Sequence, residues 1–209
     1  MRTTRQVRFQ QLAACALLAA SLLAACLSLP AQTPSAADDA HRGRWTVGAQ
    51  LGYTMEYGLD WHEVSHIQLL IAQPQLGFIL RDFQRSPVRR VEILDEGILG
   101  SAVHPHAAYL AGDAVLFRLD AKRHGRWVPF LDAGAGALRT PLARHVTEVN
   151  GFTQFTLQGG FGVQCFVRPG RALVFEWRTV HMSNADRVPP NMGFNSTLLS
   201  LGFRWRPRR

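Results

Sequence analysis

The stretch Phe155-Thr-Leu-Gln-Gly-Gly-Phe-Gly-Val-Gln-Cys-Phe-Val167 alternates apolar residues with small or polar ones. Successive side chains of a β-strand point to opposite faces, so this period of two predicts a strand with one apolar face. The other face carries glycine, glutamine and threonine, whereas the outer face of a soluble sheet usually carries many charges. Small polar side chains of this kind suit the crowded interior of a narrow barrel.

The same alternation recurs in four further segments, 44–54, 127–137, 173–181 and 197–205, and tryptophan or tyrosine stands near the ends of several apolar faces. Apolar faces of this length with aromatic ends are typical of strands that cross an outer membrane. Charged residues make up 18% of the chain, against about 25% in soluble domains. The sequence therefore predicts an all-β protein, an eight-stranded antiparallel transmembrane β-barrel. A soluble β-sandwich or lipocalin-like barrel is the competing interpretation.

The number of strand-like runs is odd. The runs are 45–55, 66–82, 88–99, 101–111, 113–120, 126–138, 152–167, 171–183 and 196–206. Single-chain bacterial barrels have an even number of strands. We therefore expect that two runs merge or that one is a loop, and the ambiguity lies between Ser86 and Gly112.

The N-terminal segment has the order of an export signal: three arginines, an apolar run over 12–29, and then small residues. We predict an export signal and leader over 1–37 and a single barrel domain over 38–209. Two processing routes stay open, because 23–26 (Leu-Ala-Ala-Cys) resembles a lipobox and 35–37 (Ser-Ala-Ala) suits ordinary cleavage. The predicted location is the outer membrane of a Gram-negative bacterium, reached after export through the signal peptide.

The chain is basic, with a formal net charge of +8, and Lys122 is its single lysine. Planar guanidinium groups suit bidentate contacts with phosphate. For an exported chain this favours a phosphorylated lipid surface over nucleic acid as partner. The histidines show no spacing typical of metal ligands, and His104 and His106 simply flank Pro105. We predict no metal and no cofactor.

One stretch carries residues suited to catalysis: Phe175-Glu-Trp-Arg-Thr-Val-His-Met-Ser-Asn-Ala-Asp-Arg-Val-Pro-Pro-Asn-Met-Gly-Phe-Asn195. His181 and Ser183 are two residues apart on a predicted strand, so they project from the same face. By parity this is the face of Phe175 and Trp177, which is predicted to meet lipid. Polar groups on hydrocarbon are costly unless they reach partners or serve a substrate.

These residues resemble the lipid A 3-O-deacylase (PagL) family of eight-stranded outer-membrane barrels. The family pattern, His-x-Ser-Asn-Ala followed by Asn-x-Gly and an acidic residue two further on, is matched by 181–185 and by 191–195 except at its last position. The resemblance implies a cofactor-free esterase that removes the 3-O-linked acyl chain of lipid A at the outside of the barrel. It implies a nucleophile at Ser183, a general base at His181 and an oxyanion donor at Asn184.

The family's glutamate falls on Asn195, while Asn191 and Gly193 are predicted to form the turn that positions it. Asparagine can still accept a hydrogen bond from the imidazole, as in Cys-His-Asn enzymes. Asp186 and Glu176 are alternative carboxylate partners for His181. Two other interpretations stay open: a catalytically weak or inactive barrel that binds lipopolysaccharide or has a structural role, and an adhesin-like barrel with functional outer loops.

Overall fold

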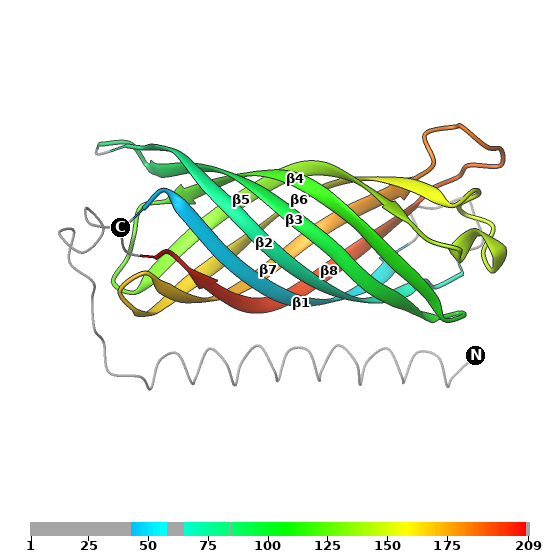
Figure 1. The fold of residues 1–209 in the computed structure, drawn as a ribbon, viewed down its shortest axis with the longest axis horizontal. Helices are drawn as coiled ribbons and strands as arrows, with labels where there is room; N and C mark the ends of the chain where they lie inside the picture. The colour runs from blue at the N-terminus through cyan, green and yellow to red at the C-terminus, as the bar shows by residue number, and fades with distance from the viewer. Residues whose placement is uncertain (1–42, 58–64, 84, 208–209) are drawn as a thin grey trace. The chain divides into compact units, whose positions relative to one another are not determined.

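The computed structural model describes residues 43–57, 65–83 and 85–207, which form a closed barrel of eight antiparallel strands (Figure 1). The strands are β1 (Trp45–Tyr57), β2 (Gln68–Asp82), β3 (Val88–His104), β4 (Ala108–Ala121), β5 (Trp127–Arg139), β6 (Thr153–Arg168), β7 (Arg171–Ser183) and β8 (Phe194–Trp205). Each strand pairs with the next, and β8 pairs with β1, so every strand has two neighbours. The predicted fold class is confirmed, and the predicted signal and leader lie outside the described residues.

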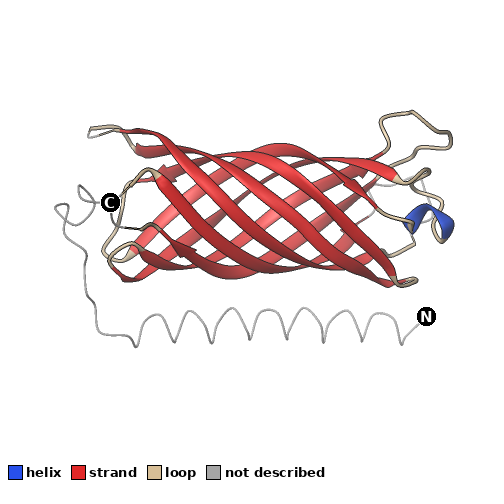
Figure 2. Ribbon diagram, viewed as in Figure 1, coloured by secondary structure: helices blue, strands red, loops and turns tan. Residues whose placement is uncertain are grey.

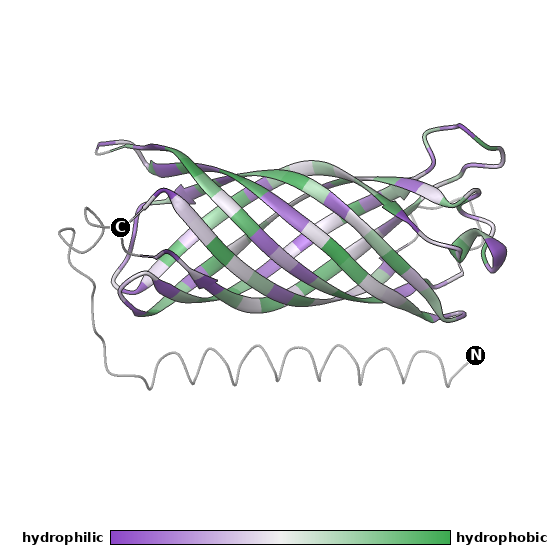
Figure 3. Cartoon of the chain, viewed as in Figure 1, coloured by the Kyte–Doolittle hydropathy of each residue, from purple (hydrophilic) through white to green (hydrophobic). Residues whose placement is uncertain are grey.

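Alternation along each strand separates an interior from an outer wall. In β1, Thr46, Gln50 and Thr54 are buried, whereas Val47 and Leu51 between them are exposed. Apolar and polar colours alternate along the strands in Figure 3. A polar interior inside an apolar wall is the arrangement of a membrane barrel and the reverse of a soluble one.

Buried ion pairs fill the middle of the barrel. Arg178 donates to both carboxylate oxygens of Glu96, with Nη1–Oε1 at 2.6 Å and Nη2–Oε2 at 2.8 Å. Arg118 donates to Asp132 at 2.8 Å, and Glu176 contacts both arginines. The charged residues of the lumen are therefore paired with one another, as buried charges must be.

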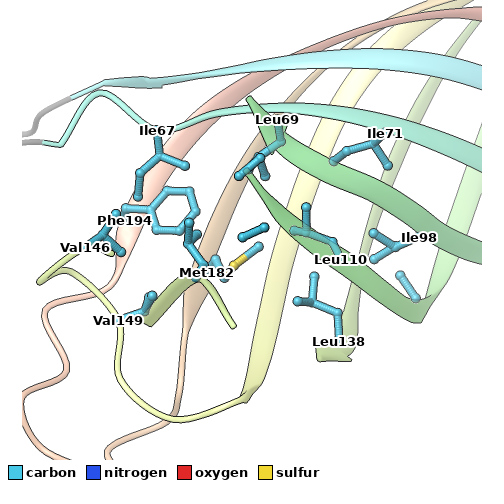
Figure 4. Close-up of a cluster of buried hydrophobic side chains, with 14 residues drawn as sticks. Ile67, Leu69, Ile71, Ile98, Leu110, Leu138, Val146, Val149, Met182 and Phe194 are labelled. Carbon is cyan, nitrogen blue, oxygen red and sulfur yellow. The ribbon is translucent and has the colours of Figure 1, made fainter. Parts of the chain in front are cut away.

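An apolar cluster occupies the interior near the ends of β7 and β8 (Figure 4). Ile67, Val146 and Val149 contribute from the strand ends and loops, and Met182 and Phe194 contribute from β7 and β8. Met182 and Phe194 are opposite each other in the strand register and both are buried. Since neighbouring residues of a strand face opposite sides, the residues next to them along each strand face outward.

The three runs predicted over 88–120, where the strand count was ambiguous, form two strands, β3 and β4. The predicted runs 88–99 and 101–111 were wrong, because β3 continues to His104 and the turn falls at 105–107. Gly100 does not break the strand: a Cβ there would lie 2.2 Å from the backbone oxygen of Leu70 on β2. This glycine permits close contact between strands, which the sequence alone does not distinguish from a turn.

The two ends of the barrel differ in their connections (Figure 2). The end where β1 begins carries the short connections 83–87, 122–126 and 169–170, whereas the other end carries the longer segments 140–152 and 184–193. Outer-membrane barrels have short periplasmic turns and long extracellular loops, so we name these the turn end and the loop end. A 3₁₀ turn, Leu142–Arg144, lies in the first long loop. Within the described ranges no helix has the length and apolarity needed to cross a bilayer.

Candidate active site

His181, Ser183 and Asn195 lie on the outer face of β7 and β8 at the loop end. His181 and Ser183 lie at the C-terminal end of β7. Asn195 lies at the start of β8, directly opposite His181 in the register. All three are half-buried. The inward-facing Met182 and Phe194 fix this orientation, because a slip of one residue would move apolar side chains out of the interior cluster.

The imidazole of His181 has a defined partner. Its Nδ1 lies 3.0 Å from Oδ1 of Asn195. An amide oxygen accepts a hydrogen bond, so this contact favours the tautomer with the proton on Nδ1. The other ring nitrogen, Nε2, then carries the lone pair that a general base requires.

Gly193 lies against the same ring in a backbone conformation suited to glycine, with φ of 66°. A Cβ at this position would lie 2.9 Å from His181 Cε1 and 3.2 Å from Nε2. The Gly193 backbone N–H donates to the carbonyl oxygen of Glu148 at 2.7 Å, and this bond connects Gly193 to the loop over 140–152. Gly193 thus combines turn geometry with close approach to the imidazole.

Asn184, the predicted oxyanion donor, is buried and holds the loop that follows β7. Its side-chain amide donates to the carbonyl oxygens of Asn150 and Val188, at 2.9 and 2.6 Å. Its backbone N–H donates to Oδ1 of Asn191 at 2.9 Å, so Asn191 also contributes to the shape of the loop. Both amide hydrogens of Asn184 are therefore engaged with loop carbonyls in this structure.

The two alternative carboxylates do not contact His181. Asp186 lies in the loop and accepts a hydrogen bond from the Asn191 side chain at 3.0 Å. Glu176 is buried in the lumen with Arg118 and Arg178. In this structure the imidazole partner is Asn195.

Sequence reasoning missed several neighbours of the site. Barrel closure places Tyr57 of β1 directly opposite Asn195, and its hydroxyl is hydrogen-bonded to the Thr179 hydroxyl of β7. On the other side, β6 places Phe155 opposite Ser183 and the exposed Leu157 opposite His181. The alternation of β1 and β6 indicated that these residues face outward, but their registers with the site strands were not available from the sequence.

The loop over 140–152 also supports the site. Asn150 accepts the Asn184 amide on its backbone oxygen and donates from its own side chain to the carbonyl of Pro189 at 2.8 Å. With the bond from Gly193 to Glu148, this joins the two long loops at three points. Among the described residues, no group of three or more histidine, cysteine, aspartate or glutamate side chains is arranged to hold a metal ion.

Fold and site together define an eight-stranded membrane barrel with a histidine, a serine and an asparagine gathered on its outer wall. A family model described as lipid A 3-O-deacylase (PagL) matches residues 47–204. The chain belongs to this family, as the residue pattern at 181–195 predicted, and it is a barrel of the Gram-negative outer membrane.

Solved structures agree with the barrel fold. The crystal structure of the outer membrane enzyme PagL is 18% identical, with a TM-score of 0.53, and the match covers 77% of this chain and 98% of that one. The crystal structure of Neisserial surface protein A (NspA) is 14% identical, with a TM-score of 0.54, and the match covers 79% and 98%. At these identities the likeness concerns the fold. No curated protein sequence matches the chain significantly.

Proposed function

We propose that this protein is an esterase that removes the 3-O-linked acyl chain of lipid A through Ser183 and His181, without a cofactor. The observation that carries the proposal is the contact between His181 Nδ1 and Asn195 Oδ1 at 3.0 Å on the outer wall, two residues from an outward-facing serine. The acyl ester of a membrane lipid would approach this wall from the bilayer. Membership of the deacylase family supports the same substrate.

In the proposed reaction, Ser183 Oγ attacks the acyl carbonyl carbon and its proton passes to His181 Nε2. The tetrahedral intermediate collapses with cleavage of the bond between the acyl carbon and the sugar oxygen. The leaving sugar oxygen takes the proton from the imidazolium and is released as a hydroxyl group. Water, deprotonated by His181, then hydrolyses the acyl-enzyme and frees the hydroxyacyl chain.

Asn184 is proposed to stabilise the oxyanion. Since its two amide hydrogens are bonded to Asn150 and Val188, this role requires one of these bonds to exchange when substrate binds. Asn184 would thus link substrate binding to the shape of the loop over 184–193.

Asn195 is expected to limit the rate. In a serine protease, replacing the triad acid by its amide lowers turnover by about 10⁴-fold, chiefly because the histidine adopts the wrong tautomer. Here the Asn195 oxygen, rather than its nitrogen, faces Nδ1, so the productive tautomer is retained. What is lost is the carboxylate charge that stabilises the imidazolium.

Mass spectrometry of lipid A from a Gram-negative host tests the proposal. Expression of the wild-type chain should remove one hydroxyacyl chain, and Ser183→Ala should leave lipid A intact. Ser101→Ala, at an outward-facing serine of β3, is the matched control and should retain activity. Removal of the acyl chain by Ser183→Ala would refute the serine mechanism.

The alternative function, a catalytically inactive barrel that binds lipopolysaccharide or has a structural role, is favoured by one feature: Asn195 replaces the acid. The same experiment separates the two. Intact lipid A with a folded wild-type barrel would support the inactive alternative.

A further inference from the structure

The turn end of the barrel is markedly basic. Its exposed cationic residues are Arg44, Arg81, Arg85, Lys122, Arg168 and Arg171. Within the described part of the chain, the exposed carboxylate at this end is Asp82, and it is paired with Arg90 at 2.8 Å. This excess of positive charge lies at the end opposite to the candidate active site, so the proposed deacylation does not account for it.

Two of these cationic residues face each other at the turn between β6 and β7. Arg168 and Arg171 are directly opposite each other across Pro169 and Gly170, and both are exposed. Like charges directly opposite on neighbouring strands destabilise a sheet. A bound anion between the two guanidinium groups would offset this repulsion.

Trp205 indicates how deep Arg168 and Arg171 lie in the membrane. It is the register partner of Arg171 on β8, and 41% of its surface is exposed on the outer wall. Exposed tryptophans of membrane barrels lie at the level of the lipid headgroups. Arg171 therefore lies at the depth where lipid phosphates occur.

A second observation lies just inside the same turn. A small cavity at the mouth of the barrel is lined by Gly170 together with Arg90, Arg204 and Arg206. Arg204 is buried and contacts Glu92 and Thr46 through Nη2, whereas its Nη1 has no hydrogen-bond partner. Buried polar groups are normally satisfied, so Arg204, opposite Ala172 in the register, leaves one donor unused close to this turn.

We infer that the turn between β6 and β7 is a binding site for the headgroup phosphate of an anionic phospholipid in the leaflet at the turn end. Arg168 and Arg171 bind the phosphate oxygens, and Trp205 packs against the adjoining glycerol region. Arginine suits this role because its planar fork bonds phosphate bidentately. The depth set by Trp205 favours a lipid over a soluble anion.

The test uses the folded mature protein in nanodiscs of phosphatidylcholine that contain a minor fraction of brominated phosphatidylglycerol or brominated phosphatidylcholine. Quenching of tryptophan fluorescence gives the association constant of the anionic lipid relative to the zwitterionic one. Near a membrane surface each arginine contributes about fivefold in affinity for anionic lipid. We expect this loss for Arg168→Gln and for Arg171→Gln, and a larger loss for the double variant.

Two pairs of substitutions serve as controls. Arg139→Gln with Arg144→Gln removes two exposed arginines at the loop end, and Arg81→Gln with Arg85→Gln removes two at the turn between β2 and β3. Both should lower the preference less than the double variant at Arg168 and Arg171. Absence of any preference in the wild type, or an equal loss in either control, would overturn the assignment.

Discussion

Asn195 places an amide oxygen 3.0 Å from His181 Nδ1, at the position where the family pattern has a carboxylate. The strands that hold the two residues are in register, so a glutamate side chain has the same direction of approach. The glutamate side chain differs from that of asparagine in its negative charge and in being one methylene group longer. A charge at this site acts on the imidazolium that forms during the reaction.

Asn195→Glu should therefore raise deacylation, but by much less than the about 10⁴-fold that the amide costs in a serine protease, because the productive tautomer of His181 is already present here. The rate is measured on purified lipid A in detergent, with folding checked by the electrophoretic mobility of the unheated barrel. Adding Ser183→Ala to the Asn195→Glu variant should abolish the gain. An unchanged rate in a folded Asn195→Glu variant would argue that the acidic partner of His181 lies elsewhere.

Gly193→Ala tests how tightly the loop holds the imidazole. The new methyl group would lie 2.9 Å from His181 Cε1, so the ring must turn away from Asn195 and turnover should fall by more than tenfold. Gly125→Ala is the matched control, because Gly125 also has a positive φ but its Cβ position has nothing within 4 Å. Both variants should lose about 1 kcal/mol of stability, and Gly125→Ala should keep its activity. Equal activity in both variants would contradict a role for Gly193 in positioning the ring.

At the scale of elements, the two long loops act as one unit because hydrogen bonds join them. Asn150 bridges them through its backbone oxygen and its side chain. The strands beneath do not depend on these bonds, since their own ladders and the apolar cluster hold them. Local loosening of the loops is therefore separable from unfolding of the barrel.

Asn150→Ala should loosen the loop over 184–193 without unfolding the barrel. The substitution removes the donor to the Pro189 carbonyl, a bond worth about 1 kcal/mol, so deacylation should fall about fivefold. Hydrogen exchange by mass spectrometry should speed up in 184–193 and stay unchanged in β3 and β4. Thr147→Ala, at an exposed residue of the same loop, serves as the control. Faster exchange throughout the barrel would instead assign Asn150 a general structural role.

The elements show what the sequence could predict. Period-two alternation in β1 and β6 was sufficient for the strand type and for the face of each residue, because burial in a barrel alternates with the pleat. The turn at 105–107 was missed, because Gly100 and Gly112 look like turn residues although each provides close contact between strands. A glycine's role depends on the neighbouring strand, which the chain order does not reveal.

The site was predictable to the extent that it is local. His181 and Ser183 share a face because they are two residues apart, and the resemblance to the family pattern implied Asn195 as the imidazole partner. Tyr57, Glu148 and Asn150 lie far from the site in the sequence and reach it through barrel closure and loop packing. The engagement of Asn184 with two loop carbonyls was likewise not visible, because it depends on where both loops fold.

At the scale of the whole molecule, the stability of the barrel depends on its two environments: along each strand, one residue faces the lipid and the next faces the polar lumen. Asp95 and Glu96 adjoin on β3, yet Glu96 is buried among Arg178 and two glutamines while Asp95 is exposed on the outer wall opposite Leu76 and Val115. A carboxylate facing hydrocarbon opposes insertion, whereas one paired in the lumen stabilises the arginine beside it. The same kind of substitution should thus have opposite effects at the two positions.

Asp95→Leu should raise the free energy of unfolding by about 1 kcal/mol, because it replaces a carboxyl group on the lipid face by an apolar one. Glu96→Leu should lower it by about 3 kcal/mol, because Arg178 loses a partner that accepts from both Nη1 and Nη2. Urea unfolding in phosphatidylcholine vesicles, followed by tryptophan fluorescence, measures both changes. The assignment of an apolar wall around a polar lumen requires the two changes to have opposite signs. Destabilisation of similar size at both positions would mean that Asp95 does not face lipid but has a partner on the outer wall.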